Sequence, residues 1–424
     1  MIGGVFGVPV VDFVNGGLTL RRISESLYFD YRATVAHWSG QGSPMRIAVL
    51  CERMTGERRV SVTPEATRTL VADGHSVVVE SNAGTAAGMS DGEYRTAGAS
   101  VAPDLAATVG DAGVVVAVNG PTDSATLGHL GGSHVVIGLY DPFWLPDVAA
   151  RLAATGATML ALDLVPRSSR AQAVDVLSSM ATVEGFQSVL LAAGRLPKML
   201  PLLMTAAGTV PPARVLVLGA GVAGLQAIAT ARRLGAVVEG FDIREEALEQ
   251  IRSLGAKSIG PPPAPDGGVP DAALIHEVLT PHVAEADMVI ATAQIPGRQS
   301  PVLVTATMVG GMRPGSVLVD LAVQRGGNCE VSIADTDVDH GGVTILGPTD
   351  LASGSAVTAS RMFATNITNL VRMLDNDGDT FVDPDDDVLA GMLVAVGGEV
   401  VHPVVRSLLE QRAEASVSDR KVGA

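Results

Sequence analysis

Four polar residues, Arg167, Gln172, Asp175 and Ser178, lie in a stretch rich in small and apolar residues, VPRSSRAQAVDVLSSMA, which spans 165–181. Gln172, Asp175 and Ser178 recur every three residues, and this spacing predicts that they share one face of a helix that Arg167 precedes. Guanidinium, amide, carboxylate and hydroxyl groups can together hold a polar ligand through hydrogen bonds. The spacing alone equally allows a face turned to solvent, so the chemistry depends on the elements that surround it.

A glycine-rich turn follows further along the chain. Gly219, Gly221 and Gly224 come after the apolar run RVLVL and lead into the helical pattern VAGLQAIATARR. This G-x-G-x-x-G spacing between a strand and a helix is typical of a dinucleotide-binding turn. The first glycine permits the tight turn, the second lets the backbone approach a pyrophosphate, and the third lets the helix pack closely on the strand. Val222 then opens the helix, whose N-terminus would face the phosphates.

An acidic residue follows the next predicted strand, VVEGF. This residue is Asp242, and it lies 18 positions after Gly224. A carboxylate at this place accepts hydrogen bonds from the adenosine ribose and repels a 2′-phosphate, which favours NAD(H). Arg244 lies two residues later, and a nearby arginine can accommodate such a phosphate. The pattern as a whole predicts that the chain binds NAD(H).

Two further loops follow predicted strands of the same unit. QIPG contains Gln294 and Pro296, and DLAVQRGGNCE contains Asp320 and Gln324. Ligands of doubly wound sheets bind outside the carboxyl ends of the strands. We therefore expect these four residues to border the nicotinamide half of the dinucleotide, although purely structural loops of Gly and Pro have the same composition.

Short apolar runs alternate with helical patterns along most of the chain, which predicts parallel sheets covered by helices. One series of five runs begins at residue 46 and a second begins at residue 214. The predicted class is therefore α/β, with two Rossmann-like doubly wound parallel-sheet domains in tandem, joined by helices over 172–207. Helical spacing over 360–374 indicates that the chain returns to the first domain, which would make that domain discontinuous.

The predicted domains are a first α/β domain over 45–185 plus 350–400 and a Rossmann NAD(H)-binding domain over 186–349. Residues 401–424 form a C-terminal tail. Residues 1–44 lack the basic cluster that precedes the apolar core of a secretory signal. They are expected to be a poorly ordered extension or to precede the true start codon, with a structural arm as the alternative.

Composition argues against several classes of protein and site. The 424 residues carry a formal net charge of −16, which disfavours binding to nucleic acid. No run reaches the ~18 consecutive apolar residues that a membrane span needs, so no direct span is expected. Cys51 and Cys329 have no cysteine neighbours that would suggest a disulfide or a zinc site, and no metal site is expected. These features favour a cytoplasmic protein.

Six segments over residues 45–400 read, in order, VPRSSRAQAVDVLSSMA, TAAGTVPPARVLVLGAGVAGLQAIATARRLGA, FDIRE, IPG, VDLAVQRGGNCE and ASRMFATNITNLV. In order and spacing they resemble the NAD(H)-binding components of proton-translocating nicotinamide nucleotide transhydrogenases, which are related to alanine dehydrogenases. The resemblance implies a discontinuous first domain, and it implies that Arg167, Gln172, Asp175 and Ser178 contact the nicotinamide end of NAD(H). Such a clamp would align two nicotinamides for hydride transfer.

Alanine dehydrogenases use an Arg, a Lys, a His and a loop Asp in their amino-acid chemistry. This sequence has Arg59, but Asn119, Asp141 and Gln324 stand at or near the other three places, so that chemistry is not expected. The sequence also departs from the transhydrogenases. In the region of their mobile loop it has a proline-rich tract without the usual Tyr, and Val269 stands near its place.

The resemblance implies an oxidoreductase, a component of the α-subunit of NAD(P)+ transhydrogenase, that passes hydride from NADH to NADP+ on a partner subunit and couples the transfer to proton translocation. It would act as a homodimer with NADP(H)-binding and membrane subunits, in the cytoplasm or held at the inner face of the membrane by those partners. The departures leave two alternatives open. One is a stand-alone NAD-dependent oxidoreductase acting on a small metabolite in a specialised biosynthetic pathway, and the other is a non-catalytic NAD(H) sensor.

Overall fold

A computed structural model describes most of the chain. The described residues are 9–14, 17–22, 45–261, 271–295, 297–376, 379–380, 382–383 and 385–422. Within the first 44 residues, strands β1 (Pro9–Val14) and β2 (Gly17–Arg22) form an antiparallel hairpin. Val269 in the proline-rich tract and Pro296 of the predicted nicotinamide loop lie outside the described residues.

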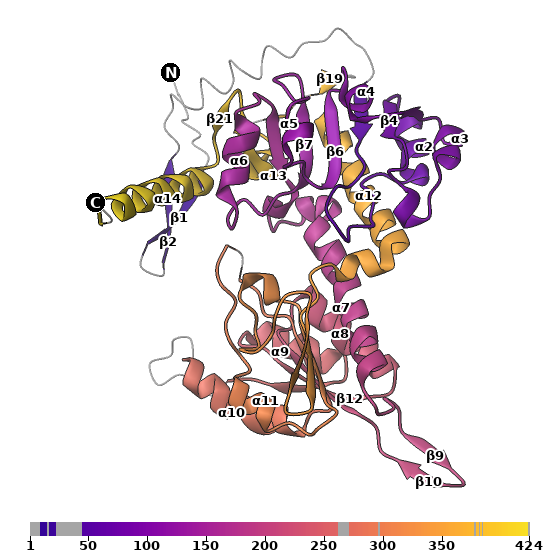
Figure 1. Ribbon diagram of the computed structural model, residues 1–424, viewed down its shortest axis with the longest axis vertical. Coiled ribbons are helices and arrows are strands. Elements are labelled where there is room, and N and C mark those ends of the chain that lie inside the picture. The colour runs from indigo at the N-terminus through magenta and orange to yellow at the C-terminus, as the bar shows by residue number, and fades with distance from the viewer. Residues whose placement is uncertain are drawn as a thin grey trace, which may run out of the picture. The chain divides into compact units, whose positions relative to one another are not determined.

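The chain forms two compact units. Unit 1 comprises Met1–Thr55, Arg59–Val176 and Ser360–Ala424, and unit 2 comprises Gly56–Arg58 and Leu177–Ala359. Apart from the short segment Gly56–Arg58, the chain passes from one unit to the other within two long helices, α7 (Val176–Arg195) and α12 (Ala356–Leu374) (Figure 1). The domain boundaries predicted from the sequence, after residue 185 and before residue 350, stay predictions.

Unit 1 contains an eight-stranded sheet in the order β21-β20-β8-β7-β6-β3-β4-β5. The five apolar runs of the first predicted series all form parallel strands, which confirms the α/β prediction: β3 (Arg46–Val49), β4 (Ser76–Glu80), β6 (Val114–Asn119), β7 (Val135–Leu139) and β8 (Thr158–Ala161). Three short strands extend the sheet: β5 (Ser100–Ala102), β20 (Leu393–Val396) and β21 (Glu399–Val400). Strands β20 and β21 follow α12, and β20 pairs with β8 in the antiparallel sense.

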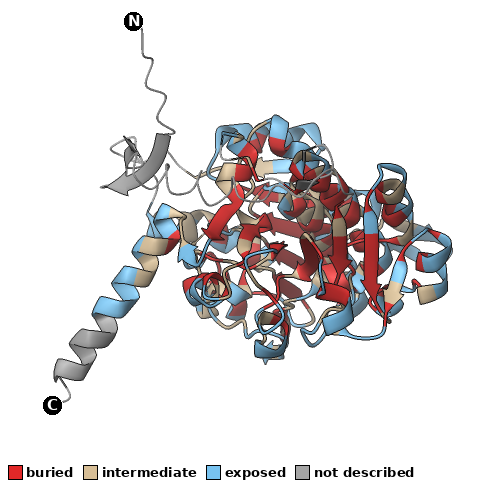
Figure 2. Ribbon diagram, turned by 90° about the horizontal axis from the view of Figure 1, so that it is seen from above, coloured by how far each residue is buried: buried red, intermediate tan, exposed pale blue. Residues whose placement is uncertain are grey.

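Helices flank this sheet, and Figure 2 shows largely buried strands beside helices with exposed outer faces. The helices of unit 1, besides its parts of α7 and α12, are α2 (Pro64–Ala72), α3 (Asp91–Thr96), α4 (Leu105–Val109), α5 (Ser124–Leu127), α6 (Pro146–Ala153), α13 (Asp387–Met392) and α14 (Pro403–Val422), with 3-10 turns η1 (Thr85–Ala87), η2 (Leu162–Leu164) and η3 (Arg170–Val174). Most of the predicted tail is helix α14, whose Arg412 donates to Asp147 of α6 at 2.7 Å.

Side-chain caps explain where several of these helices begin. Thr63 accepts a hydrogen bond from the amide of Ala66 and is followed by proline at the first helical position of α2. Ser90 and Glu93 form a reciprocal capping box at the start of α3. Such caps satisfy amides that have no partner within the helix, and each contributes ~1 kcal/mol. The first turns of these helices are therefore encoded locally.

Unit 2 contains a seven-stranded sheet in the order β13-β12-β11-β14-β15-β17-β16. The second predicted series is also confirmed, because its five runs form the parallel strands β11 (Arg214–Leu218), β12 (Val237–Phe241), β14 (Met288–Ala291), β15 (Val317–Asp320) and β17 (Val343–Leu346). Strand β13 (Lys257–Ile259) adds a parallel edge, and β16 (Asp337–His340) adds an antiparallel one.

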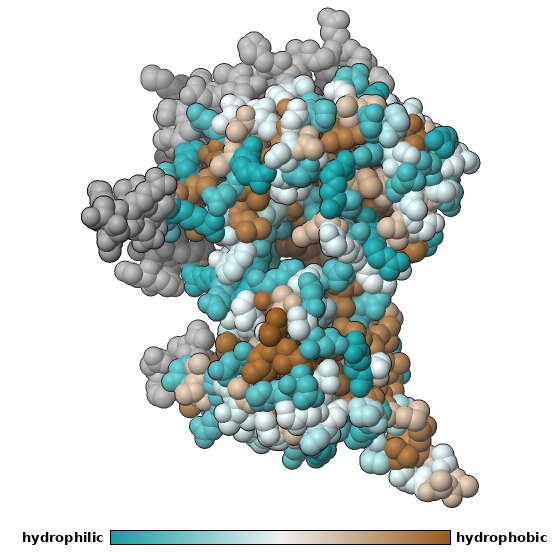
Figure 3. Space-filling view, viewed as in Figure 1, coloured by the Kyte–Doolittle hydropathy of each residue, from teal (hydrophilic) through white to brown (hydrophobic). Residues whose placement is uncertain are grey.

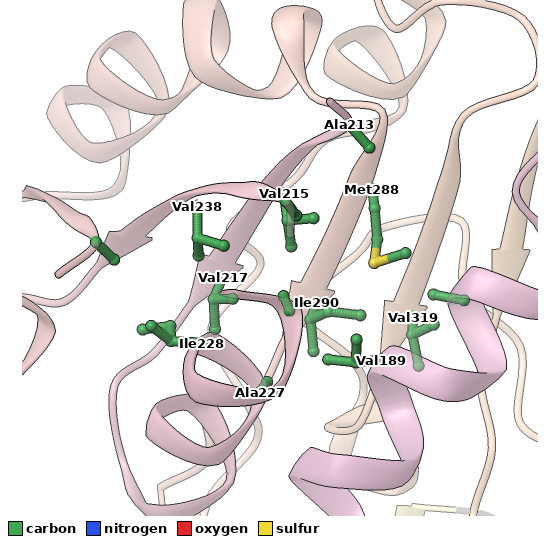
Figure 4. Packing of buried hydrophobic residues seen from close by; sticks show 14 of the residues in the cluster. Val189, Ala213, Val215, Val217, Ala227, Ile228, Val238, Met288, Ile290 and Val319 are labelled. Atoms are coloured by element: carbon green, nitrogen blue, oxygen red, sulfur yellow. The ribbon is translucent and has the colours of Figure 1, made fainter. Parts of the chain in front are cut away.

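The core of unit 2 joins this sheet to its helices. Val215 and Val217 of β11 lie among Val238 of β12, Ile290 of β14 and Ile228 of the following helix (Figure 4). All of these side chains are at most 2% exposed. The helices of unit 2 besides α7 are α8 (Val222–Arg233), α9 (Glu245–Ser253), α10 (Ala272–Glu285) and α11 (Ala306–Gly310), with 3-10 turns η4 (Val323–Arg325) and η5 (Leu351–Ser355).

The segment predicted to be helical over 172–207 is only partly helical, and that prediction was wrong at its end. Helix α7 stops at Arg195, because Pro197 and Pro201 cannot continue it. The chain then forms an antiparallel hairpin of β9 (Leu203–Thr205) and β10 (Gly208–Val210). Within the described part of the chain, α7 is the one helix long and apolar enough to span a membrane, judged by length and composition alone. Its Val189 and Ala192 are fully buried in the core of unit 2.

Candidate dinucleotide-binding site

The glycine turn of unit 2 joins β11 to α8. Gly219 has a φ of +91°, a conformation that L side chains rarely adopt, so glycine suits this tight turn. A Cβ atom on Gly224 would lie 1.9 Å from the carbonyl oxygen of Gly219. Any side chain at Gly224 would therefore push helix α8 away from the strand. Both glycines have the structural roles that the spacing predicted.

Gly221 differs from the other two glycines of the turn, because a Cβ atom placed on it would meet no atom within 4 Å. This residue is the N-cap of α8, and no side chain caps that helix end. Val222, the first helical residue, is 41% exposed. A helix N-terminus without a side-chain cap presents backbone amides and the positive end of the helix dipole to an anion. The turn thus offers an accessible cradle whose chemistry fits a pyrophosphate.

Asp242 follows β12 and is buried beside the glycine turn. Its carboxylate accepts hydrogen bonds from the backbone amides of Ala220 at 2.8 Å and of Arg244 at 2.9 Å. Burial raises the pKa of the Asp242 carboxyl, but the hydrogen bonds from Arg244 and Ala220 lower it more, so the pKa lies below its ordinary value. The side chain is therefore an anionic hydrogen-bond acceptor at the adenosine end of the predicted site.

Arg244 also binds Asp242 through its guanidinium group. Its Nε and Nη2 atoms donate to the two carboxylate oxygens, each at 3.0 Å. Each oxygen of Asp242 thus accepts two hydrogen bonds, which fills the four acceptor positions of a carboxylate. A ribose hydroxyl that donates to Asp242 must compete with Arg244, whose side chain is 59% exposed. Arg244 can turn away, because most of its side chain is surrounded by solvent.

The predicted nicotinamide loops lie after β14 and β15. Gln294 is exposed and its Nε2 donates to the carbonyl of Leu321 at 2.7 Å, which ties the two loops together. Gln324 is also exposed, and its Nε2 contacts the carbonyl of Thr349 at 3.4 Å. The structure therefore places both glutamines on the surface at the carboxyl ends of the strands.

Asp320 occupies a different place from the one expected of a ligand-binding residue. Its side chain has no exposed surface, and it accepts hydrogen bonds from the amides of Ala322, Asn328 and Cys329 and from the hydroxyl of Ser332. Every one of these donors comes from the loop that follows β15. Asp320 therefore shapes this loop from inside and does not present its carboxylate to a ligand.

Asn328 is a residue of this site that the sequence pattern did not indicate. Its side chain is fully buried and forms hydrogen bonds with the loop after β14. Its Oδ1 accepts from the backbone amide of Ala293 at 2.9 Å, and its Nδ2 donates to the carbonyls of Ala293 and Pro301, each at 2.8 Å. The only signal in the sequence was its place after the pair Gly326 and Gly327. Asn328 holds the backbone next to Gln294.

The polar stretch that begins at Arg167 does not form one helix, and that prediction was wrong. Residues Arg170–Val174 form the 3-10 turn η3, Asp175 ends this turn with a ψ of +86°, and α7 begins at Val176. A spacing of three matches the three residues per turn of a 3-10 helix, but the change of direction at Asp175 separates it from α7. Ser178 therefore belongs to a different helix, and it lies in unit 2.

The four polar residues in and beside η3 differ in their exposure to solvent. Arg167 and Gln172 are exposed, and Asp175 and Ser178 are half-buried. Arg170, to which the sequence pattern assigned no role, forms ion pairs with Asp386 and Asp387 at the start of α13. Burial raises the pKa of the Asp386 carboxyl, but the hydrogen bonds from the backbone amides of α13 and from Arg170 lower it more, so the pKa lies below its ordinary value. Arg170 thereby connects the turn to the start of α13 within unit 1.

Two of the three positions that differ from alanine dehydrogenases, Asn119 and Asp141, lie at strand ends in unit 1. Asn119 ends β6, and its amide and Nδ2 lie 3.2 Å and 3.5 Å from Oε2 of Glu52. Asp141, after β7, has a φ of +50°. Neither residue supplies the ammonium or imidazole group of the dehydrogenase mechanism. The side chains at these positions therefore offer no replacement for that chemistry.

Comparisons with known proteins support one family along nearly the whole chain. The model of the alanine dehydrogenase/PNT N-terminal domain matches residues 48–184, and that of the C-terminal domain matches residues 188–403. An NAD(P) transhydrogenase subunit alpha polypeptide of Rhodospirillum rubrum is 40% identical over 85% of this chain and 99% of its own length. The alanine dehydrogenase of Halomonas elongata is 31% identical over 70% of this chain and 77% of its own length.

Solved structures give the same result. A transhydrogenase from Sinorhizobium meliloti has a TM-score of 0.75 and 41% identity, over 84% of this chain and 99% of its own. An L-alanine dehydrogenase has a TM-score of 0.74 and 29% identity, over 87% of this chain and 99% of its own. The two relatives match the fold almost equally well, so the fold does not distinguish their activities.

Proposed function

Because the chain belongs to the alanine dehydrogenase/PNT family of oxidoreductases, we propose that it is the NAD(H)-binding component of a proton-translocating NAD(P)+ transhydrogenase. In this proposal it transfers hydride from NADH to NADP+ held by a partner subunit, and the transfer is coupled to proton translocation. Membrane subunits would hold it at the inner face of the membrane. The similarity to transhydrogenase α subunits over 85% of the chain supports this choice over an alanine dehydrogenase.

One observation carries the binding of NAD(H). Gly221 faces open space at the end of α8 that no side chain caps, and the anionic Asp242 lies beside this turn. Gly219, Gly221, Val222 and Gly224 would hold the pyrophosphate, and Asp242 with Arg244 would bind the adenosine ribose. Gln294, Pro296 and Gln324 would border the nicotinamide, with Asp320 shaping their loop from inside.

The polar residues around η3 would orient the dihydronicotinamide. The amide of Gln172 can hydrogen-bond a carboxamide, and Arg167, Asp175 and Ser178 can fix its position. NADH supplies the hydride and its electron pair, so these side chains need no acid or base function. Their contribution is alignment, on which hydride transfer depends strongly.

We also propose that the chain forms a homodimer through unit 2. The hairpin of β9 and β10, at the lower right of Figure 3, carries brown apolar surface. Met204 and Val210 in this hairpin are 79% and 40% exposed. An open groove of about 620 Å³ lies at its base, lined mainly by apolar residues that include Leu190, Pro197 and Leu234. Large apolar side chains exposed to this degree next to an apolar groove are typical of a surface that another protein chain covers. Sedimentation of Met204→Asp, with Thr205→Ala as the control, tests this interface.

A hydride-exchange assay tests the proposed activity. The purified protein is mixed with a soluble NADP(H)-binding transhydrogenase component, NADPH, NADH and an NAD+ analogue whose reduction has its own absorbance. Rapid reduction of the analogue is expected. Tight NADH binding without exchange would overturn the proposal and favour the stand-alone oxidoreductase acting on a small metabolite, for which Asn119 and Asp141 would be the first residues to study.

A further inference from the structure

Two amide side chains of α12 converge on one carbonyl group of the turn η3. The Nδ2 atoms of Asn366 and Asn369 donate to the carbonyl oxygen of Ala173, at 2.9 Å and 3.0 Å. A carbonyl oxygen has two lone pairs, so these two donors fill its accepting capacity. Ala173 directly follows Gln172 in the chain. All of these residues belong to unit 1.

The turn is short, and its own backbone hydrogen bonding is weak at the end nearest α7. Its closing bond, from the amide of Asp175 to the carbonyl of Gln172, is long at 3.4 Å. The last carbonyls of a helix have no partner within it, and η3 is too short to have an interior. The conformation near Gln172 therefore depends on bonds from elsewhere in unit 1.

Packing in the core of unit 1 fixes the position of helix α12, which carries the two asparagines. Phe363, Ile367 and Leu370 on this helix are fully buried in unit 1, so its orientation is fixed by packing. Asn366 and Asn369 are three residues apart and lie on one face. Two donors from one packed helix fix both the direction of the Ala173 carbonyl and the distance between this carbonyl and α12. Ala171 and Val174, at most 1% exposed, fix the two ends of the turn by burial.

We infer that Asn366 and Asn369 are positioning residues that hold the turn presenting Gln172, although neither would touch a ligand itself. This inference rests on the proposed function for its catalytic meaning, because Gln172 orients the nicotinamide only in that proposal. Hydride transfer is sensitive to misplacement by ~1 Å, which can lower the rate by ~100-fold. Loss of the Asn bonds should therefore lower kcat and leave the affinity for NADH almost unchanged.

The test uses Asn369→Asp and Asn369→Ala, because Asn369 is more exposed than the buried Asn366 and tolerates change better. Aspartate keeps the shape of the side chain but replaces the donor by an acceptor that repels the Ala173 carbonyl. The matched control is Thr365→Ala on the exposed face of α12, where Oγ1 donates to the carbonyl of Arg361 in its own helix. Thermal unfolding of each variant checks that it is folded.

Amide hydrogen exchange of residues 170–176 reports on the turn without any ligand. We expect exchange to be about 10-fold faster in both Asn369 variants than in Thr365→Ala. In the hydride-exchange assay we expect kcat to fall ~10-fold or more, with the Kd for NADH changed less than about twofold. Unchanged exchange in the turn, or a loosened turn with unchanged kcat, would overturn the inference. An inactive wild-type protein would instead overturn the proposed function, while amide exchange would still decide whether the two asparagines hold the turn.

Discussion

The two turns that the sequence marked out are built in opposite ways. The turn between β11 and α8 is held by close backbone packing, with Gly224 against the carbonyl of Gly219. The turn at Arg170–Val174 is held by side chains of distant segments, with Arg170 paired to Asp386 and the carbonyl of Ala173 bound by two asparagines. The comparison shows that the conformation of a turn can be encoded by neighbouring residues or by segments far apart in the chain, and the two kinds of turn should respond differently to mutation.

The glycine turn should be broken most severely by a single methyl group. In Gly224→Ala the new Cβ would lie 1.9 Å from the carbonyl oxygen of Gly219, so α8 must shift. We expect a loss of about 3 kcal/mol in the free energy of unfolding and roughly 100-fold weaker NADH binding. Urea unfolding and fluorescence titration with NADH measure these two quantities.

Gly221→Ala is the matched control for this change. Its Cβ would meet no protein atom, and its φ of −77° suits alanine, so stability should change by less than about 0.5 kcal/mol. NADH binding should still weaken, because the methyl group would stand where a pyrophosphate approaches the backbone. Normal NADH affinity in Gly221→Ala would show that the phosphates bind elsewhere.

A substitution in the turn η3 should lower the rate of hydride transfer and leave the stability of the protein almost unchanged. Gln172 is exposed, so Gln172→Asn should leave the free energy of unfolding within about 0.5 kcal/mol of the wild type. The shorter side chain draws the amide back by more than ~1 Å, and we expect kcat for hydride exchange to fall ~100-fold. Steady-state kinetics and NADH titration separate the two effects, and an equal loss in kcat and in NADH affinity would contradict the clamp.

The contrast also explains how much could be predicted from the sequence. The strands and the glycine turn were predictable, because apolar runs, helix caps and the spacing of Gly219, Gly221 and Gly224 act over a few residues. The break at Asp175 was not predictable, since a spacing of three fits both a 3-10 turn and an α-helix. The roles of Asn328 and Asn369 depend on contacts with Ala293 and Ala173, which only the folded chain brings together.

A substitution of Asn328 tests whether a loop of unit 2 also depends on a side chain from a distant part of the sequence. Asn328→Ala removes three hydrogen bonds of a fully buried side chain and leaves the amide and carbonyl of Ala293 without these partners. We expect a loss of about 2–3 kcal/mol in the free energy of unfolding. NADH binding should weaken by ~10-fold, because Gln294 follows the loosened residue. Thr336→Ala is the control, because Thr336 is exposed in unit 2, its Oγ1 donates only to the nearby carbonyl of Ala334, and it has no proposed role at the site. This variant should change neither quantity appreciably, and a similar effect in both variants would remove Asn328 from the site.

The smallest effect concerns the pair of Asp242 and Arg244, and it depends on pH. The pKa of Asp242 is lowered in the folded protein, so the carboxylate stabilises the fold above its unfolded pKa of ~3.9, and this stabilisation is lost as the pH falls through the lower, folded pKa. Arg244→Ala should raise the folded pKa, because burial then acts with fewer compensating hydrogen bonds. The variant should be less stable by about 1 kcal/mol at pH 7, with the difference from wild type shrinking below about pH 4.

Urea unfolding from about pH 7 to pH 3 measures this change, and Arg252→Ala, which removes an exposed pair with Glu245, is the control. The control variant should lose little stability, because an exposed ion pair is screened by solvent. A difference that stays constant over this range would mean that Arg244 stabilises the fold without acting on the charge of Asp242.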